Sequence, residues 1–224
     1  MNGYALGLAR DRFERGARYA PPLSALNRVL YVLAGELAVT DGGRHARVAT
    51  DGAGHGSGQG EAVAGPDGAT VLRWELATPS RARIGRGGGA GIVTEILLEH
   101  PIDLDPAEQY LMRADRVDFA PGGVALPHRH KGGGIRCLIA GTLEVRVGDE
   151  PPRLVGPGQA WFESGREPVR AAASADHPTS FIRVAILPRA IKGMSSIVYV
   201  DPDDAARGKP RKYTVYVDEP IEIG

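Results

Sequence analysis

The sequence predicts an all-β protein built from two similar barrel-like lobes. Glycine and proline, 31 and 17 of the 224 residues, interrupt the chain at frequent intervals. The stretches between them are short and rich in β-branched residues, as in antiparallel sheets with many turns. One strand, turn and strand pattern also occurs twice, which indicates two equivalent lobes. Together these observations favour a many-stranded barrel architecture over other fold classes.

The strands follow from local composition. Each predicted strand is a run of Val, Ile, Leu, Thr or Tyr, which fit a pleated and half-buried surface. The clearest strands are predicted at 29–33, 36–40, 70–76, 91–98, 135–139, 143–147, 180–187 and 213–217.

Helix signals are weak by comparison. Asp105 and Pro106 form an N-cap and a first helical position, but strand-like alternation returns by Val117, so at most one turn is expected. Residues 203–207 could form another turn. Neither is long enough to cover a sheet, which argues against an α/β layer fold.

Two glycine-rich stretches separate the predicted strands. Residues 51–68 are expected to form a loop or a distorted strand, because glycine allows close backbone approach. Residues 81–91 contain three consecutive glycines, but no helix follows them, so a phosphate-binding loop is not supported. We expect this second stretch to connect the lobes.

The internal repeat is the strongest sign of domain organisation. Residues 28–39 and 135–145 each contain an apolar strand, a turn glycine and a second strand, with Gly35 and Gly141 at equivalent positions. A turn, a further strand and a glycine-rich corner follow each copy. Two equivalent barrels are the simplest explanation.

Composition excludes several classes of partner. Lys plus Arg and Asp plus Glu both number 27, so the net charge is zero. Such a chain has no general attraction to nucleic acid or to an anionic membrane. Its one cysteine, Cys137, allows no intramolecular disulfide bond. No signal-peptide pattern and no run of about 18 apolar residues occurs, so we expect a cytoplasmic protein.

One stretch of the C-terminal half carries a family resemblance. Gly122, His128 and His130, with Gly141 beyond them, resemble the first motif of the cupin superfamily. The Pro-Gly corner and strand at 154–163 resemble the second motif. The resemblance implies a bicupin of two double-stranded β-helix (jelly-roll) barrels. A degenerate N-terminal lobe would span 1–100, and a lobe with the histidine site and a C-terminal strand extension would span 101–224.

The His pair is a candidate metal site. Residues at i and i+2 of a strand point to the same side, so His128 and His130 can offer two imidazoles to one divalent cation such as Fe, Mn, Ni, Cu or Zn. The chain departs from the cupin pattern, however. Gly134 stands where the family has a glutamate ligand, and Pro168 or Val169 stands where it has a second-motif histidine.

Two carboxylates could replace the missing ligands. Glu163 lies on the strand of Trp161, and Glu167 follows four residues later. Either could complete a set of two histidines and one carboxylate, as third ligand or as general base. The alternative is that His128 and His130 only line the barrel and bond to one of these carboxylates without a metal.

A candidate substrate clamp lies beside the His pair. Counting alternate residues from Gly134 puts Arg136 inside the barrel, where it needs an acidic partner or a ligand carboxylate. A position at the barrel mouth is the alternative. Trp161 is expected in the core or at the mouth and is a second candidate for substrate binding.

These residues support two functions. The first is a metal-dependent enzyme of oxygenase, lyase or isomerase type that acts on a small carboxylate-bearing metabolite. The second is a non-catalytic small-molecule-binding or structural protein without metal, because loss of ligands accompanies loss of catalysis. The alternating segment 212–220 is expected to end the chain as a strand that pairs with the other lobe or with a second subunit, giving a homodimer.

Overall fold

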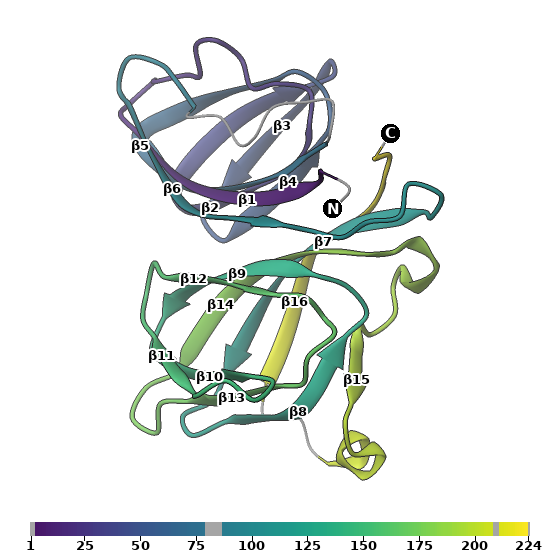
Figure 1. The fold of residues 1–224 in the computed structure, drawn as a ribbon. Coiled ribbons are helices and arrows are strands. Elements are labelled where there is room, and N and C mark those ends of the chain that lie inside the picture. Colours follow the sequence, from purple (N-terminus) through teal and green to yellow (C-terminus); the bar gives the residue numbers. More distant parts are fainter. Residues whose placement is uncertain (1–2, 79–86, 208–210, 224) are drawn as a thin grey trace. The chain divides into compact units, whose positions relative to one another are not determined.

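The computed structural model describes residues 3–78, 87–207 and 211–223. Strands β1 to β16 make up nearly all of the regular structure there, with two short 3-10 helices. The chain forms two compact units (Figure 1). Unit 1 comprises Met1–Glu108 and Ile221–Gly224, and unit 2 comprises Gln109–Pro220. No helix in the described ranges is long and apolar enough to span a membrane.

Unit 1 is a curved antiparallel sheet of six strands (Figure 1). The strand order is β3-β2-β5-β1-β6, and β4 pairs with β2. The two longest strands, β2 and β5, pair along most of their length with register shifts that bend them. The strands are β1 (Ala5–Phe13), β2 (Asn27–Asp41), β3 (Arg44–Ala49), β4 (Gly52–Gly56), β5 (Gly60–Ala77) and β6 (Ile92–Pro101).

Unit 2 contains two five-stranded sheets with a common apolar core. One has the order β12-β9-β14-β7-β16 and the other β11-β10-β13-β8-β15. Trp161 and Leu138 of the first sheet pack with Leu143 and Val169 of the second in one cluster of buried side chains. The strands are β7 (Tyr110–Phe119), β8 (Val124–His130), β9 (Gly134–Ala140), β10 (Leu143–Val147), β11 (Arg153–Val155), β12 (Ala160–Glu163), β13 (Val169–Ala173), β14 (Thr179–Pro188), β15 (Ile197–Tyr199) and β16 (Arg211–Ile221).

The repeat includes two turn glycines that have the same structural role. Gly35 and Gly141 both adopt positive φ, +81° and +71°. At each position a β-carbon would collide with the backbone of the neighbouring strand or of the turn that leads into it. Glycine is therefore required at both turns, which explains why the sequence repeats at these positions.

The all-β prediction is confirmed, and each predicted strand overlaps an observed one. The strands predicted at 29–33 and 36–40 are one bent strand, β2. Residues 52–56 and 60–68, expected as a loop or distorted strand, belong to β4 and β5, whose glycines pack closely against neighbouring atoms. Residues 105–108 form a single turn, and Pro202–Ala206 form a 3-10 helix. Residues 81–86 lie outside the described residues. The strands before and after 81–91, β5 and β6, both belong to unit 1, so the expectation that this stretch connects the lobes is wrong.

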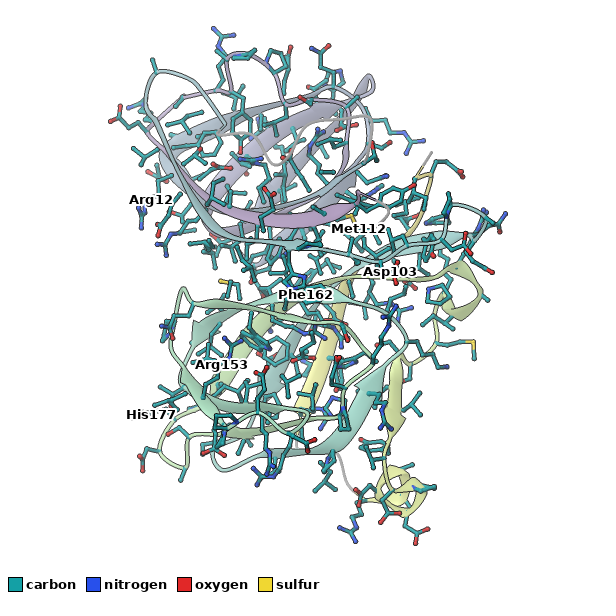
Figure 2. All side chains as sticks on the ribbon, viewed as in Figure 1. Arg12, Asp103, Met112, Arg153, Phe162 and His177 are labelled. Carbon is teal, nitrogen blue, oxygen red and sulfur yellow. The ribbon has the colours of Figure 1, made fainter. Side chains whose placement is uncertain are left out.

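Surface and interior side chains of unit 2 separate clearly. Arg153 and His177 are exposed (Figure 2). Cys137 is buried, on the face of β9 opposite to that of Arg136. β16 pairs with β7 inside unit 2, so the C-terminal strand completes this unit's own sheet.

Candidate functional site

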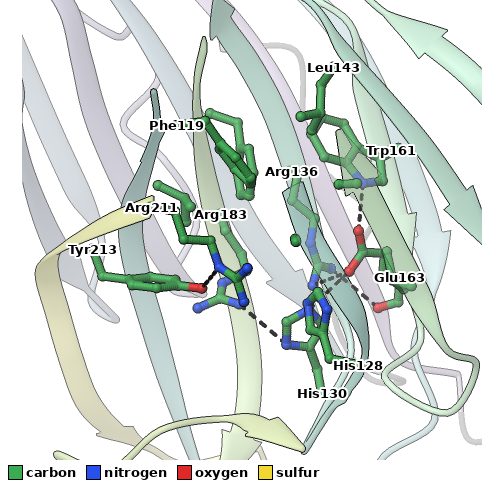
Figure 3. Close-up of a pocket in the computed structure, with 15 residues that line it drawn as sticks. Phe119, His128, His130, Arg136, Leu143, Trp161, Glu163, Arg183, Arg211 and Tyr213 are labelled. Carbon is green, nitrogen blue, oxygen red and sulfur yellow. Dashed lines mark hydrogen bonds and ion pairs between the residues drawn. The ribbon is translucent and has the colours of Figure 1, made fainter. Parts of the chain in front are cut away.

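A pocket opens into the barrel of unit 2 between its two sheets. Its empty volume is about 370 Å³, including the part open to solvent. Phe119, Leu143 and Trp161 lie along one side of it, and charged side chains lie along the other (Figure 3). The charged and polar side comprises His128, His130, Arg136, Glu163, Arg183, Arg211 and Tyr213.

The two histidines project from β8 into this pocket, as their i and i+2 spacing predicts. Their rings lie 4.9 Å apart, edge to face. The Nδ1 atom of His128 lies 2.7 Å from the carbonyl oxygen of Leu126. Because a carbonyl oxygen only accepts, Nδ1 carries the proton and Nε2 keeps a free lone pair. Burial lowers the pKa of His128, so this ring is neutral at pH 7.

His130 is held from both sides. Its Nε2 lies 3.2 Å from Glu163 Oε2, and its Nδ1 lies 3.4 Å from Arg183 Nη1. Since an arginine nitrogen only donates, Nδ1 accepts and Nε2 carries the proton. Burial lowers the pKa of His130 to about 3, and the nearby Arg136 and Arg183 act in the same direction.

Glu163 is the central acceptor of the site. Arg136 Nη2 lies 2.7 Å from Glu163 Oε2, and Trp161 Nε1 donates to Glu163 Oε1 at 2.8 Å. Burial alone would raise the pKa of Glu163, but the charge of Arg136 and the contact with His130 hold it below its ordinary value. The buried carboxylate is therefore ionised. Burial lowers the pKa of Arg136 to about 10, so this side chain remains a cation at neutral pH.

The glycine that replaces the cupin glutamate has a packing cause. Gly134 begins β9 opposite Glu163 on β12 and Ala185 on β14. A β-carbon at position 134 would lie 2.8 Å from the Ala185 Cα and closer still to the Val184 carbonyl oxygen. The backbone of β14 therefore occupies the space that a glutamate side chain would need.

Two further arginines complete the charged side. Arg183 donates to both carboxylate oxygens of Asp115, at 3.0 and 2.5 Å. Burial would lower the pKa of Arg183, but Asp115 raises it above its ordinary value. Arg211 donates to the hydroxyl of Tyr213 and, at 3.5 Å, to that of Tyr199. Within the described ranges, Arg211 has no carboxylate partner.

The structure brings five of the predicted site residues together. His128, His130, Arg136, Trp161 and Glu163 all line the pocket. Glu167 does not. It is exposed on the turn after β12, where it accepts a hydrogen bond from Ser164, which lowers its pKa.

The described side chains do not form a metal centre. Among them, no three His, Cys, Asp or Glu residues are grouped to hold an ion. His128 offers the lone pair of Nε2, whereas the lone pair of His130 Nδ1 accepts a hydrogen bond from Arg183. The oxygens of Glu163 are used by Arg136, Trp161 and His130. A resident metal would have to displace these contacts.

The sequence analysis missed three polar or charged residues that line the pocket, Arg183, Arg211 and Tyr213. Arg183 lies directly opposite Arg136 in the pairing of β14 with β9, so counting alternate residues on both strands would have found it. No local signal identifies Arg211 or Tyr213. Both lie on β16, which reaches the barrel from the far end of the chain.

Comparisons with known proteins agree with this fold. Residues 115–185 match the family model of the cupin domain. No curated protein matches the sequence. The crystal structure of a Lactobacillus farciminis oxalate decarboxylase in complex with formate is similar, at 13% identity and a TM-score of 0.64, over 90% of this chain and 82% of that one.

Two other solved structures are also similar. A deletion mutant of the Bacillus subtilis oxalate decarboxylase OxdC has 14% identity and a TM-score of 0.64, over 90% of this chain and 73% of that one. AerE from Microcystis aeruginosa has 13% identity and a TM-score of 0.59, over 83% of this chain and 88% of that one. At such identities the likeness shows the fold alone. Residues 115–185, which match the cupin domain model, include most of the residues that line the pocket.

Proposed function

We propose that the barrel of unit 2 binds a small carboxylate-bearing molecule, and that binding needs no resident metal ion. The observation that carries the proposal is Arg211. This cation lines the pocket, and its partners there are the neutral hydroxyls of Tyr213 and Tyr199. A guanidinium group binds a carboxylate with two parallel hydrogen bonds, which makes an organic anion its natural ligand.

The charge balance of the pocket supports an anion. The arginines Arg136 and Arg183 are neutralised by Glu163 and Asp115, and both histidines are neutral. Three arginines against two carboxylates leave one positive charge, on Arg211. A metal cation would add to this excess, whereas a carboxylate would balance it.

The solved neighbours add a general argument. One is an oxalate decarboxylase in complex with formate. A protein of this fold therefore binds a carboxylate, which is compatible with the same class of ligand here. At 13% identity this likeness supports no more specific statement about the ligand of this protein.

A metal-dependent enzyme of oxygenase, lyase or isomerase type is the second candidate, and one observation favours it. The Nε2 lone pair of His128 is free, and the ring of His130 lies beside it. With a bound ion, His128, His130 and Glu163 would be the ligands, and Fe, Mn, Ni or Zn would polarise a bound carboxylate. This function requires Glu163 to exchange Arg136 for the ion.

The predicted organisation remains part of the proposal. Unit 1 would be a degenerate cupin lobe, so that the whole chain is a bicupin, with the lobes near 1–100 and 101–224. Segment 212–220 pairs with β7 in its own unit, so a homodimer would have to use other surface of the protein.

The test combines metal analysis with ligand titration. The purified protein and a His128→Ala/His130→Ala variant are analysed for metals, treated with a chelator and titrated by calorimetry with acetate, hexanoate, benzoate and oxalate. We expect less than one tenth of an equivalent of metal and saturable binding of at least one carboxylate to the chelated parent. Binding that appears only after Fe, Mn, Ni or Zn is restored would favour the enzyme. No binding of any carboxylate would refute the proposal.

A further inference from the structure

We infer that the ligand of the unit 2 pocket is a monocarboxylate with an apolar body, held by its single negative charge at Arg211 and by its hydrocarbon part against the aromatic side of the barrel. This inference rests on the proposed function. The inferred ligand carries one negative charge and an apolar body. The single charge follows from the ion pairs among the pocket residues, and the apolar body follows from the aromatic side chains of the opposite wall.

The pocket has one cationic position to offer and no second one. Arg136 contacts Glu163 and donates to the Gly134 carbonyl oxygen, and Arg183 uses two nitrogens on Asp115. The remaining nitrogen of Arg183 faces His130. A second carboxylate on the ligand would therefore meet no arginine that lacks an acidic partner, and it would lie close to the carboxylate of Glu163. Burial of an unpaired charge beside a like charge is strongly unfavourable, so a dianion is excluded.

The opposite side of the pocket offers only carbon. Trp161 and Phe181 pack edge to face with ring centroids 5.4 Å apart, and Phe181 and Phe119 follow at 6.2 Å. The one polar atom of this wall, Trp161 Nε1, already donates to Glu163. Leu143 extends the wall (Figure 3). A ligand group against it has no hydrogen bond to make, so hydrocarbon is preferred to a polar group.

The enclosed part of the pocket is small. The space open to the centre of a water-sized sphere is about 30 Å³, and the 370 Å³ of empty volume includes the part open to solvent. The enclosed part has room for a few water molecules, so the body of a short aliphatic or single-ring acid has to extend into the open mouth of the pocket.

Four probes that differ by one feature test the inference. Hexanoate has both the charge and the tail. Acetate removes the tail, hexanamide removes the charge, and adipate adds a second carboxylate at the far end. We expect hexanoate to bind at least tenfold more tightly than hexanamide or adipate. Along the series from acetate to hexanoate, affinity should rise about fourfold per methylene until the pocket is full. Calorimetry on the full-length, chelator-treated protein gives these constants.

A matched pair of variants locates the tail. Leu143→Val shortens a side chain of the apolar wall, and Leu154→Val makes the same change at a residue that is 71% exposed on β11. Leu143→Val should weaken hexanoate binding by up to about fourfold and leave acetate unchanged. Leu154→Val should alter neither. The substitution is small enough to keep the fold, and circular dichroism of both variants checks this.

The outcomes separate the two proposals. If acetate or adipate binds as tightly as hexanoate, the ligand class inferred here is wrong, whereas carboxylate binding by the pocket stands. Equal affinity for hexanamide and hexanoate would contradict both, because the charge would then play no part. Equal effects of Leu143→Val and Leu154→Val would show that the tail does not lie against this wall.

Discussion

Units 1 and 2 carry the same buried arginine at the same place in the repeat, but the charges around it differ. Arg73 lies opposite Leu30 in the pairing of β5 with β2, and Arg183 lies opposite Arg136 in the pairing of β14 with β9. Leu30 and Arg136 are equivalent in the repeat. Each buried arginine bonds to an aspartate from the first strand of its unit. Asp11 accepts from Arg73 at 2.7 Å in unit 1, and Asp115 accepts from Arg183 in unit 2.

The difference lies in the remaining charges. In unit 1, Arg28 contacts Asp41 and Glu75, and Arg73 contacts Asp11 and Glu75. Among the residues described there, two arginines face three carboxylates in this cluster. The unit 2 pocket is lined by three arginines and one carboxylate, Glu163, and Asp115 behind Arg183 adds a second carboxylate. Carboxylates are thus in excess in the unit 1 cluster and arginines in the unit 2 cluster, and the proposed anion binding in unit 2 depends on this difference.

The largest expected effect is on the shared ion pairs. Arg73→Met should leave Asp11 and Glu75 short of a cation, and Arg183→Met should leave Asp115 unpaired. Removing one partner of a buried pair costs about 3–5 kcal/mol of the free energy of unfolding, so both variants should be strongly destabilised. Denaturant titration followed by hydrogen exchange measures each unit separately. A loss below about 1 kcal/mol in either unit would show that its pair is not structural.

The second largest effect is expected from replacing Glu163, the carboxylate that neutralises Arg136. Glu163→Gln keeps the shape of the side chain but leaves Arg136 buried without a counter-charge, so we expect about 3 kcal/mol of destabilisation. The pocket also gains a second free cation. The affinity of adipate relative to hexanoate should therefore rise at least tenfold in calorimetry. An unchanged ratio would mean that Arg136 does not face the ligand.

Mild acid should destabilise unit 2 by a smaller amount. The pKa of His130 is lowered to about 3 by burial and by Arg136 and Arg183, whereas an unfolded histidine titrates near 6.5. Between these values only the unfolded state binds the proton, so the free energy of unfolding falls as the pH falls below 6.5. The loss is about 2 kcal/mol at pH 5.

Denaturation at pH 7 and pH 5 measures this loss, and His130→Asn is the control. The variant should lose less stability than the parent over the same pH range. Equal stability of parent unit 2 at the two pH values would contradict the neutral, buried state of His130.

The smallest effect is expected at Glu167. This side chain is exposed and lies outside the pocket, so Glu167→Gln should change the unfolding free energy by less than about 0.5 kcal/mol. Hexanoate affinity should stay within twofold of the parent value. A large loss of binding would place Glu167 at the site in solution and revive the prediction made from its spacing.

Much of the fold could be predicted because most strands are rich in β-branched residues. Several strands were missed, and two of them have other compositions. β4 (Gly52–Gly56) contains three glycines, and β13 (Val169–Ala173) contains three alanines. Neither sequence favours a strand by itself, and pairing with β2 or β10 holds each one in place. Tertiary context rather than local propensity therefore determined these elements.

The site residues could be predicted where the alternation of side chains along a single strand determines which face they occupy. Alternation on β8 and β9 correctly indicated that His128, His130 and Arg136 share the barrel interior. The environment of each group was not predictable, because it depends on contacts between distant strands. Arg183 and Asp115 meet across 68 residues, and Arg211 enters from β16. These contacts decide that the charge excess lies on Arg211 rather than on Arg136.

The central claim is that Arg211 supplies the one free positive charge of the pocket. Hexanoate binding to the parent, Arg211→Lys, Arg211→Gln and Arg153→Gln tests it most directly, with the exposed Arg153 on β11 as the matched control. Loss of a charged hydrogen bond predicts roughly 10- to 100-fold weaker binding for Arg211→Gln. Arg211→Lys should retain part of the affinity, and Arg153→Gln should match the parent. Parent-like binding by a folded Arg211→Gln would contradict the account.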